Sequence, residues 1–334
     1  NFDKLDGSIN LYSSGSNNLK DTNNLSTLIT NDIEYNSINY FTNFGLNNNF
    51  NIYLKNLNAV GKNNANYSSS PSVNLMSMFE FASNLPLIKE NSLTKEILTP
   101  KISFRLNPGN MKNHSSSNKI ITVDDVFSIN RLGISDSFEE GKSLTLGIDY
   151  KLNYDNQTSD KDKFLEFKLA TVFRDEVVSK IPISSTIDKK NSNLFGTINN
   201  NLLENLNLSY DFSIDNNFKN FESHSIGAEI SINNFLTKFD FTEQGNELGS
   251  SHIIANETSY TLNDSSSISF STRRNKEISL TEYYDLSYQY QNDCLTAALK
   301  YNKTFYQDND LKPEENLFFT ITLIPLTTFE RRIY

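Results

Sequence analysis

The 334-residue chain contains no tryptophan, one cysteine, seven prolines and three histidines. A single cysteine, Cys294, excludes an internal disulfide framework. No stretch approaches the ~18 consecutive apolar residues of a transmembrane helix, which excludes a helical membrane protein. The formal net charge of -10 argues against a nucleic-acid partner, because such a partner needs clustered Lys and Arg.

Signals of catalysis are also missing. His114, His224 and His252 are far apart in the sequence and show no metal-ligand spacing. The chain carries no nucleophile elbow and no phosphate-binding glycine loop. The sequence therefore predicts neither an enzyme nor a cofactor or metal site.

What the chain does contain is period-two alternation, which is typical of β-strands. In the segment 280–290, Tyr284, Leu286 and Tyr288 alternate with Asp285 and Ser287. Segments of about ten residues are long enough to cross a bilayer as tilted strands, with one apolar face and one polar face. The pattern predicts an all-β protein, an antiparallel transmembrane β-barrel of about sixteen strands. The predicted strands are 25–33, 38–46, 50–57, 73–81, 97–106, 143–154, 164–173, 194–202, 205–214, 225–232, 235–241, 251–262, 266–272, 280–290, 295–305 and 316–324.

The lengths of the predicted links support a barrel, because outer-membrane barrels have short periplasmic turns and longer external loops. Counted back from the last strand, alternate links are short: 292–293, 263–264, 233–234, 203–204 and 47–49. The opposite links are longer: 243–250, 215–224, 174–193, 107–142 and 59–72. Links 155–163 and 85–96 are longer than this scheme expects. A soluble β-sandwich has no reason to sort its loops in this way.

Several segments together resemble the LPS-assembly protein family, whose outer-membrane translocon component is called LptD. The first two are Leu98-Thr-Pro-Lys-Ile-Ser-Phe-Arg-Leu-Asn-Pro108 and Asp124-Asp-Val-Phe-Ser-Ile-Asn-Arg-Leu-Gly133. The others are Glu140-Gly-Lys-Ser-Leu-Thr-Leu-Gly-Ile-Asp-Tyr150, Tyr283-Tyr-Asp-Leu-Ser-Tyr-Gln-Tyr-Gln-Asn-Asp-Cys294 and Leu311-Lys-Pro-Glu-Glu-Asn-Leu-Phe-Phe-Thr-Ile-Thr-Leu-Ile-Pro325. The chain is most similar to the alphaproteobacterial branch.

The resemblance covers residues 97–334, whereas residues 1–96 match only through their strand pattern. It implies a single barrel domain, with N-terminal strands in 1–96 and LptD-like strands in 97–334. The family has a periplasmic β-jellyroll and more strands than are counted here. We therefore expect that the N-terminal part is missing and that this chain alone is an open sheet.

Cys294 lies at the predicted periplasmic end of a strand, in the oxidising compartment where disulfides persist. Before the resemblance is considered, a free buried thiol is the simpler interpretation. The resemblance implies a disulfide between Cys294 and the missing periplasmic domain.

The resemblance also implies a lateral seam along the strand that ends the sequence pattern. Its residues are Leu317, Phe319, Ile321, Leu323 and Pro325, and the proline cannot donate to a β-ladder. The alternative is that Pro325 merely ends the strand.

Residues 107–142 form a long predicted loop that mixes charged and apolar side chains. It is either a salt-bridged plug inside the lumen or a solvated external loop. The candidate plug residues are Asp124, Asp125, Asn130, Arg131, Glu139 and Glu140.

The resemblance implies a translocon in the outer membrane of a Gram-negative bacterium that inserts lipopolysaccharide into the outer leaflet through a lateral seam. Its implied partners are lipopolysaccharide, an LptE-like lipoprotein plug and periplasmic bridge proteins. Two alternatives stay open: a general porin, which would conduct ions, and a secreted glycan-binding β-sandwich, which would be soluble without detergent.

Overall fold

The structure is a computed structural model that describes residues 6–154, 163–245, 248, 250–305, 313–323 and 327–332. These residues form nineteen β-strands in one sheet and one short 3-10 helix, η1 (Ile183–Ser185). No helix among them is long and apolar enough to cross a membrane. The prediction of an all-β, antiparallel chain is confirmed.

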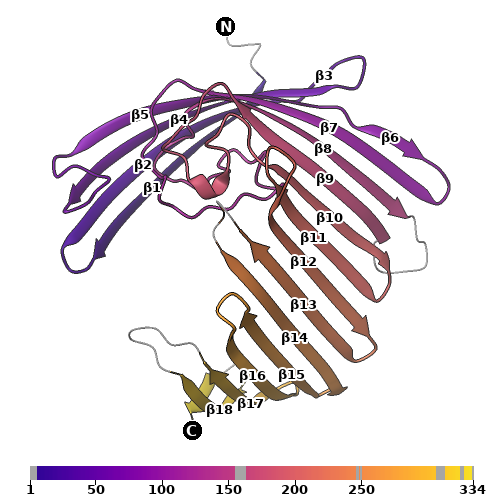
Figure 1. Cartoon of the computed structure of the whole chain (residues 1–334). Helices are drawn as coiled ribbons and strands as arrows, with labels where there is room; N and C mark the ends of the chain where they lie inside the picture. The colour runs from indigo at the N-terminus through magenta and orange to yellow at the C-terminus, as the bar shows by residue number, and fades with distance from the viewer. Residues whose placement is uncertain are drawn as a thin grey trace. The chain divides into compact units, whose positions relative to one another are not determined.

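The chain divides into two compact units, which we describe separately (Figure 1). The first comprises residues up to 152 together with 167–196 and 213–220, and the second comprises 153–166, 197–212 and the residues from 221 onward. Strands β8 (Gly141–Tyr154), β9 (Lys163–Arg174), β10 (Leu194–Leu203) and β11 (Leu206–Ile214) contribute residues to both units.

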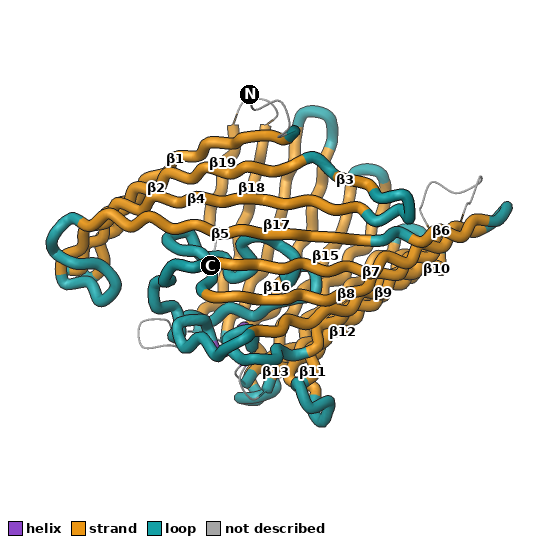
Figure 2. Tube along the Cα trace, turned by 90° about the horizontal axis from the view of Figure 1, so that it is seen from above, coloured by secondary structure: helices purple, strands orange, loops and turns teal. Residues whose placement is uncertain are grey.

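In the first unit, antiparallel pairs join β1 to β2, β2 to β4, β4 to β5 and β5 to β7, and Figure 2 shows these strands side by side. Two short strands, β3 and β6, pair with β4 and β7 respectively. The strand bounds are β1 Gly7–Lys20, β2 Asn24–Ser37, β3 Tyr40–Phe41, β4 Asn47–Lys62, β5 Ser72–Asn84, β6 Leu87–Glu90 and β7 Thr94–Asn107.

In the second unit, consecutive strands from β12 to β19 pair as an antiparallel meander. Asn233, at φ 50°, sits in the turn between β12 and β13, where a left-handed conformation suits asparagine. The bounds are β12 Phe221–Ile232, β13 Phe235–Gln244, β14 Ser251–Asn263, β15 Ser266–Asn275, β16 Leu280–Gln291, β17 Leu295–Thr304, β18 Glu314–Leu323 and β19 Thr327–Arg332.

The two faces of the sheet in the first unit have inverted polarity. Asn51, Glu80 and Arg105 lie in register on β4, β5 and β7 and are only 8%, 6% and 3% exposed. The opposite face presents Phe81 and Phe104, which pair across β5 and β7 at 40% and 37% exposure. A soluble sandwich buries its apolar face, whereas a membrane barrel turns that face outward to lipid.

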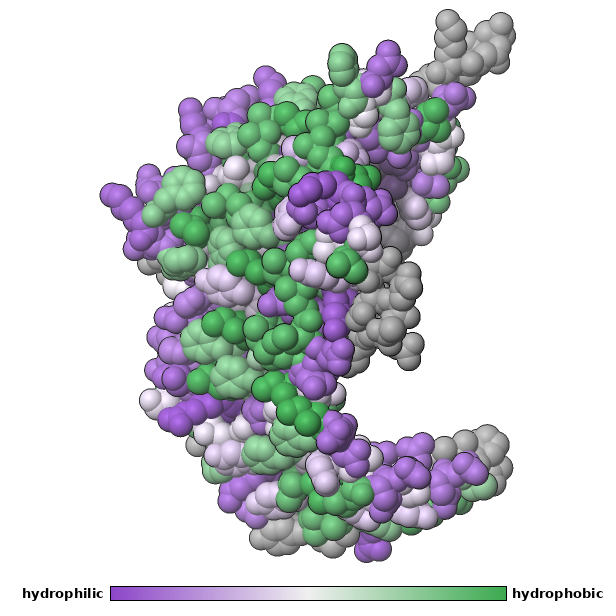
Figure 3. Space-filling view, turned by 90° about the vertical axis from the view of Figure 1, so that its right-hand side faces the viewer, coloured by the Kyte–Doolittle hydropathy of each residue, from purple (hydrophilic) through white to green (hydrophobic). Residues whose placement is uncertain are grey.

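The second unit shows the same alternation. On β12, Ile226 and Ile230 are 40% and 37% exposed, and they alternate with Ser225, Gly227 and Glu229. Figure 3 shows hydrophobic side chains gathered over the middle of the visible surface, with hydrophilic side chains at its margins.

Three strands were not predicted from the sequence: β1, β6 and β19. The predicted strand 38–46 is wrong, because only Tyr40–Phe41 is a strand there. Residues 47–49 belong to β4 rather than to a turn. Link 85–96 is long because it contains β6, which forms a hairpin with β7. Link 155–163 falls almost wholly outside the described residues, and residue 96, the predicted limit between the two barrel parts, lies within β7.

Candidate functional site

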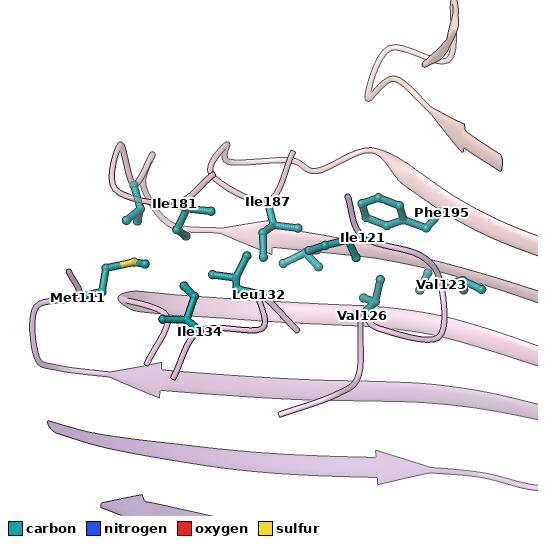
Figure 4. Close-up of a cluster of buried hydrophobic side chains, with 12 residues drawn as sticks. Met111, Ile121, Val123, Val126, Leu132, Ile134, Ile181, Ile187 and Phe195 are labelled. Atoms are coloured by element: carbon teal, nitrogen blue, oxygen red, sulfur yellow. The ribbon is translucent and has the colours of Figure 1, made fainter. Parts of the chain in front are cut away.

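Two long loops of the first unit pack together on the polar side of its strands. The β7–β8 loop comprises residues 108–140 and the β9–β10 loop comprises residues 175–193. Figure 1 shows both loops and η1 gathered on one side of the strands. They share a hydrophobic cluster with β9 and β10, drawn in Figure 4: Met111, Ile121, Val123, Val126, Leu132, Ile134, Ala170, Val172, Val178, Ile181, Ile187 and Phe195. A loop with its own buried core is folded structure, not a solvated segment.

A buried ionic network ties this cluster to the strands. Arg131, which is fully buried, donates from Nε to Glu139 Oε2 at 2.7 Å. Arg174, at the end of β9, contacts the same carboxylate through Nη2. One carboxylate from the β7–β8 loop therefore bridges an arginine of its own loop and an arginine of a strand.

Both guanidinium groups make further hydrogen bonds. Arg131 donates at 3.0 Å to Thr145 Oγ1 and to Ser143 Oγ on β8. Arg174 donates to the Ile187 carbonyl oxygen in the β9–β10 loop at 2.6 Å. Burial lowers the pKa of Arg131 to about 9, so the group stays cationic at neutral pH.

A third arginine, Arg105 on β7, also holds the β7–β8 loop against the sheet. Arg105 Nε donates to Glu80 Oε1 at 2.9 Å, and Ser103 donates to the same oxygen at 3.0 Å. Arg105 Nη2 donates to the carbonyl oxygens of Phe127 and Ser128 in the loop, both at 2.9 Å. The polar residues that lie in register on β4, β5 and β7 therefore anchor the loop to the polar face of the sheet.

Phe127 fits against a glycine of β8. A Cβ atom on Gly147 would lie 2.6 Å from Phe127 Cε2 and 3.0 Å from the Leu169 carbonyl oxygen. Such a close approach of a ring to backbone requires glycine. Lys101 Nζ lies 5.7 Å from the centre of the Phe127 ring and contacts Asp149.

A third contact joins the β7–β8 loop to the link between β4 and β5. Asp136 accepts from Tyr67 Oη at 2.5 Å and lies 2.8 Å from His114 Nε2. Burial raises the pKa of Asp136, but the hydrogen bonds from His114, Tyr67 and Ser137 outweigh burial and leave it lowered. Burial, with the hydrogen bond to Asp136, raises the pKa of Tyr67.

The structure separates the six candidate plug residues by role. Arg131 and Glu139 form the buried ion pair. Glu140 Oε2 accepts from Lys180 Nζ at 2.7 Å, which links the two long loops. Asn130 closes a turn with both backbone groups of Ile134.

The other two candidates lie nearer the surface. Asp124, 68% exposed, pairs with Lys168 at 2.9 Å, and Asp125 accepts from the Thr122 backbone N–H at 3.1 Å. Neither joins the buried network.

Sequence analysis did not single out Arg105, Arg174 or Glu80, and it predicted 174–193 only as a long link, without a role in the site. The sequence places Glu80 and Arg105 only on the polar faces of their strands. It does not predict that they pair, because the pairing depends on the register of the strands. An Arg at the junction of a strand and a long loop was the only local signal for Arg174.

Cys294 is exposed and unbonded in the turn between β16 and β17. Its backbone N–H donates to Asn292 Oδ1 at 3.0 Å, which closes the turn. The turn belongs to the end of the second unit where links are short, as predicted, and the disulfide stays a prediction.

The predicted seam residues Leu317, Phe319, Ile321 and Leu323 lie on β18, on the same face as Leu299 and Tyr301 of β17. The expectation that this strand is the last one is wrong, because β19 pairs with its other edge from Phe318 to Leu323. Pro325 lies outside the described residues.

Among the described residues, no group of three or more His, Cys, Asp or Glu side chains is placed to hold a metal ion.

Comparison with known proteins identifies a family. Residues 42–248 match the model of LptD, LPS transport system D. A search of curated proteins returns no significant match.

Among solved structures, two mutants of the Rhodopseudomonas blastica porin are similar at 11% sequence identity. One aligns over 97% of this chain and 100% of its own with a TM-score of 0.35, and the other over 89% and 95% with a TM-score of 0.34.

The family match includes strands β4 to β13, both long loops and the buried ionic network. The family is a transport component rather than an enzyme, and it acts at the outer membrane of Gram-negative bacteria. The chain belongs to the LptD family and is an outer-membrane component of lipopolysaccharide transport.

Proposed function

We propose that this protein inserts lipopolysaccharide into the outer leaflet through a β-barrel with a lateral seam. The observation that carries the proposal is the inverted polarity of the strands, in a chain of this family. Buried Glu80 and Arg105 face one side, whereas exposed Phe81 and Phe104 face the other. In a barrel, the polar side would line a path for sugars, and the apolar side would face lipid.

The β7–β8 loop acts in this proposal as a plug within the lumen. Its support is the side on which the loop lies: Arg131 donates to Ser143 and Thr145, and Arg105 donates to the loop backbone, all on the polar face. A loop held by buried ion pairs and its own hydrophobic core would keep the path closed to ions while neighbouring strands of the barrel separate.

The seam lies at the C-terminal end of the meander. The outward residues of β18 are apolar, with Phe319 36% and Leu323 44% exposed. Strand β19 has six residues, each paired with β18. A short terminal strand adds few ladder hydrogen bonds, so the seam is proposed at β19 rather than directly at β18.

The proposed partners are an LptE-like lipoprotein that occupies the lumen and periplasmic bridge proteins that deliver lipopolysaccharide. Cys294 is proposed to form a disulfide with a cysteine outside this chain, on the periplasmic side. Its support is the exposure of the thiol in a short turn.

Depletion of the protein tests the proposal. Newly made lipopolysaccharide should then fail to reach the cell surface, measured by its access to a surface-acting lipid A modifying enzyme. Normal surface delivery after depletion would contradict the proposal. A general porin would instead give loss of small-solute uptake with lipopolysaccharide delivery unchanged.

A further inference from the structure

The second unit contains a hollow of about 380 Å³ among strands β9 to β13, lined by both polar and apolar groups. This volume falls within the usual range for small-ligand sites, roughly 300–1,000 Å³. Asn207, Ser209, Gly227 and Asp240 line it, and Phe164 adds an aromatic ring. We refer to it as the Gly227 hollow.

Gly227 lies in the middle of β12 and lets Ser209 approach the strand closely at one side of the hollow. Gly227 is paired directly with Asp240 on β13, and a Cβ atom there would lie 2.4 Å from Ser209 Oγ. Ile226 and Ile230 point to the opposite, exposed apolar face. The Gly227 hollow therefore opens on the polar face, the one assigned to the transport path.

The hollow offers many hydrogen-bonding groups and little net positive charge. Asn207 provides amide donors and an acceptor, Ser209 a hydroxyl, and Asp240 two carboxylate oxygens. Lys238 is the lining cation, and it lies 3.4 Å from Glu229 in an ion pair. The two carboxylates, Asp240 and Glu229, outnumber the single lysine and would repel a phosphate group, whereas an uncharged polyhydroxyl ligand can hydrogen-bond here without that repulsion.

We propose that the Gly227 hollow is a subsite for the uncharged sugars of lipopolysaccharide on their way along the polar face. This inference rests on the proposed transport function and specifies which part of the substrate the second unit recognises. Alternating amide, hydroxyl and carboxylate groups match the neighbouring hydroxyls of a sugar ring. The Phe164 ring offers an apolar surface to the C–H face of the same ring.

The test is calorimetric titration of the full-length protein in detergent with deacylated core oligosaccharide as the probe. Asn207→Ala and Asp240→Asn each remove one hydrogen-bonding function, and each should weaken binding about fivefold or more. Gly227→Ala, which displaces the Ser209 hydroxyl, should weaken it as well. Asp285→Asn on β16, outside the hollow, is the matched control for Asp240→Asn and should leave the affinity unchanged.

Inorganic phosphate serves as the second probe and should not compete with the oligosaccharide. Unchanged oligosaccharide affinity in all three hollow variants, with normal lipopolysaccharide delivery, would overturn the subsite and leave the transport function intact. Competition by phosphate would equally overturn it, because the site would then recognise anions. Loss of surface delivery is a separate readout, so failure of the transport function is recognised independently.

Discussion

Replacement of Glu139 by glutamine should release the β7–β8 loop from the strands. The carboxylate is 8% exposed and contacts Arg131 and Arg174, whose side chains are 0% and 1% exposed. Removing one partner of a buried ion pair costs about 3–5 kcal/mol, because the other charge stays buried without compensation. Here two arginines lose their shared carboxylate, although each keeps hydrogen bonds to the loops or to β8.

The expected effect is local opening rather than global unfolding. A loss of this size corresponds to an increase of roughly two to four orders of magnitude in the opening constant of the loop. Amide hydrogen exchange of peptides from residues 108–140 measures it directly. Asp124→Asn, the same chemical change at an exposed ion pair of the same loop, should alter exchange little. Exchange in Glu139→Gln within threefold of the wild type would refute the buried-network argument.

Three other perturbations give distinct outcomes. Gly147→Ala places a methyl group against Phe127 and should destabilise the loop by about 1–3 kcal/mol, which limited proteolysis measures. The control is Gly15→Ala on β1, which should be tolerated because the atom nearest to the added Cβ is 3.7 Å away. Equal effects of the two substitutions would contradict the packing argument. The lowered pKa of Asp136 means that its contribution to stability is fully present above about pH 4 and is lost as pH falls through the lowered value. A proteolysis profile from pH 7 to pH 3 should show this loss of stability in acid, and Asp136→Asn should flatten the profile. An identical loss in that variant would show that Asp136 is not its cause. Cys294→Ser in the full-length protein should abolish a reduction-sensitive shift in gel mobility. A shift that persists in this variant would contradict the proposed disulfide.

Period-two patterning predicted most strands because the alternation of apolar and polar side chains is a property of each strand by itself. It placed β16, Leu280–Gln291, almost to the residue. It missed β1, whose sequence GSINLYSSGSNNLK is rich in Ser, Asn and Gly and carries few apolar residues in alternation. Strand β19 was missed because its sequence, TTFERR, has one apolar residue and therefore no alternation.

The site was only partly predictable for a different reason. Arg131 and Glu139 are eight positions apart in a segment of mixed composition, and their pairing is a local event that the sequence suggested. Glu80 and Arg105 meet only when the register of β5 and β7 is set. The cluster of the two long loops joins residues more than forty positions apart, such as Leu132 and Ile187, and no local pattern predicts that they share one cluster.

The polarity of the strands also corrects an ambiguity that the sequence left open. Alternation alone does not say which face is buried. The low exposure of Lys55 and Glu80, both 6%, together with the exposure of Leu54 at 45%, decides the orientation in the first unit. Buried charges on a sheet are tolerated only with partners, and Lys55 has Asp32 at 2.6 Å.

The central claim, that lipopolysaccharide travels along the polar face, is tested most directly by photo-crosslinking in living cells. A photoreactive residue at Ser269, on the polar face of β15, should form adducts with newly made lipopolysaccharide, and these adducts should vanish when export from the inner membrane is blocked. Absence of adducts at Ser269 and at the neighbouring polar-face residue Ser259, with export intact, would contradict the account.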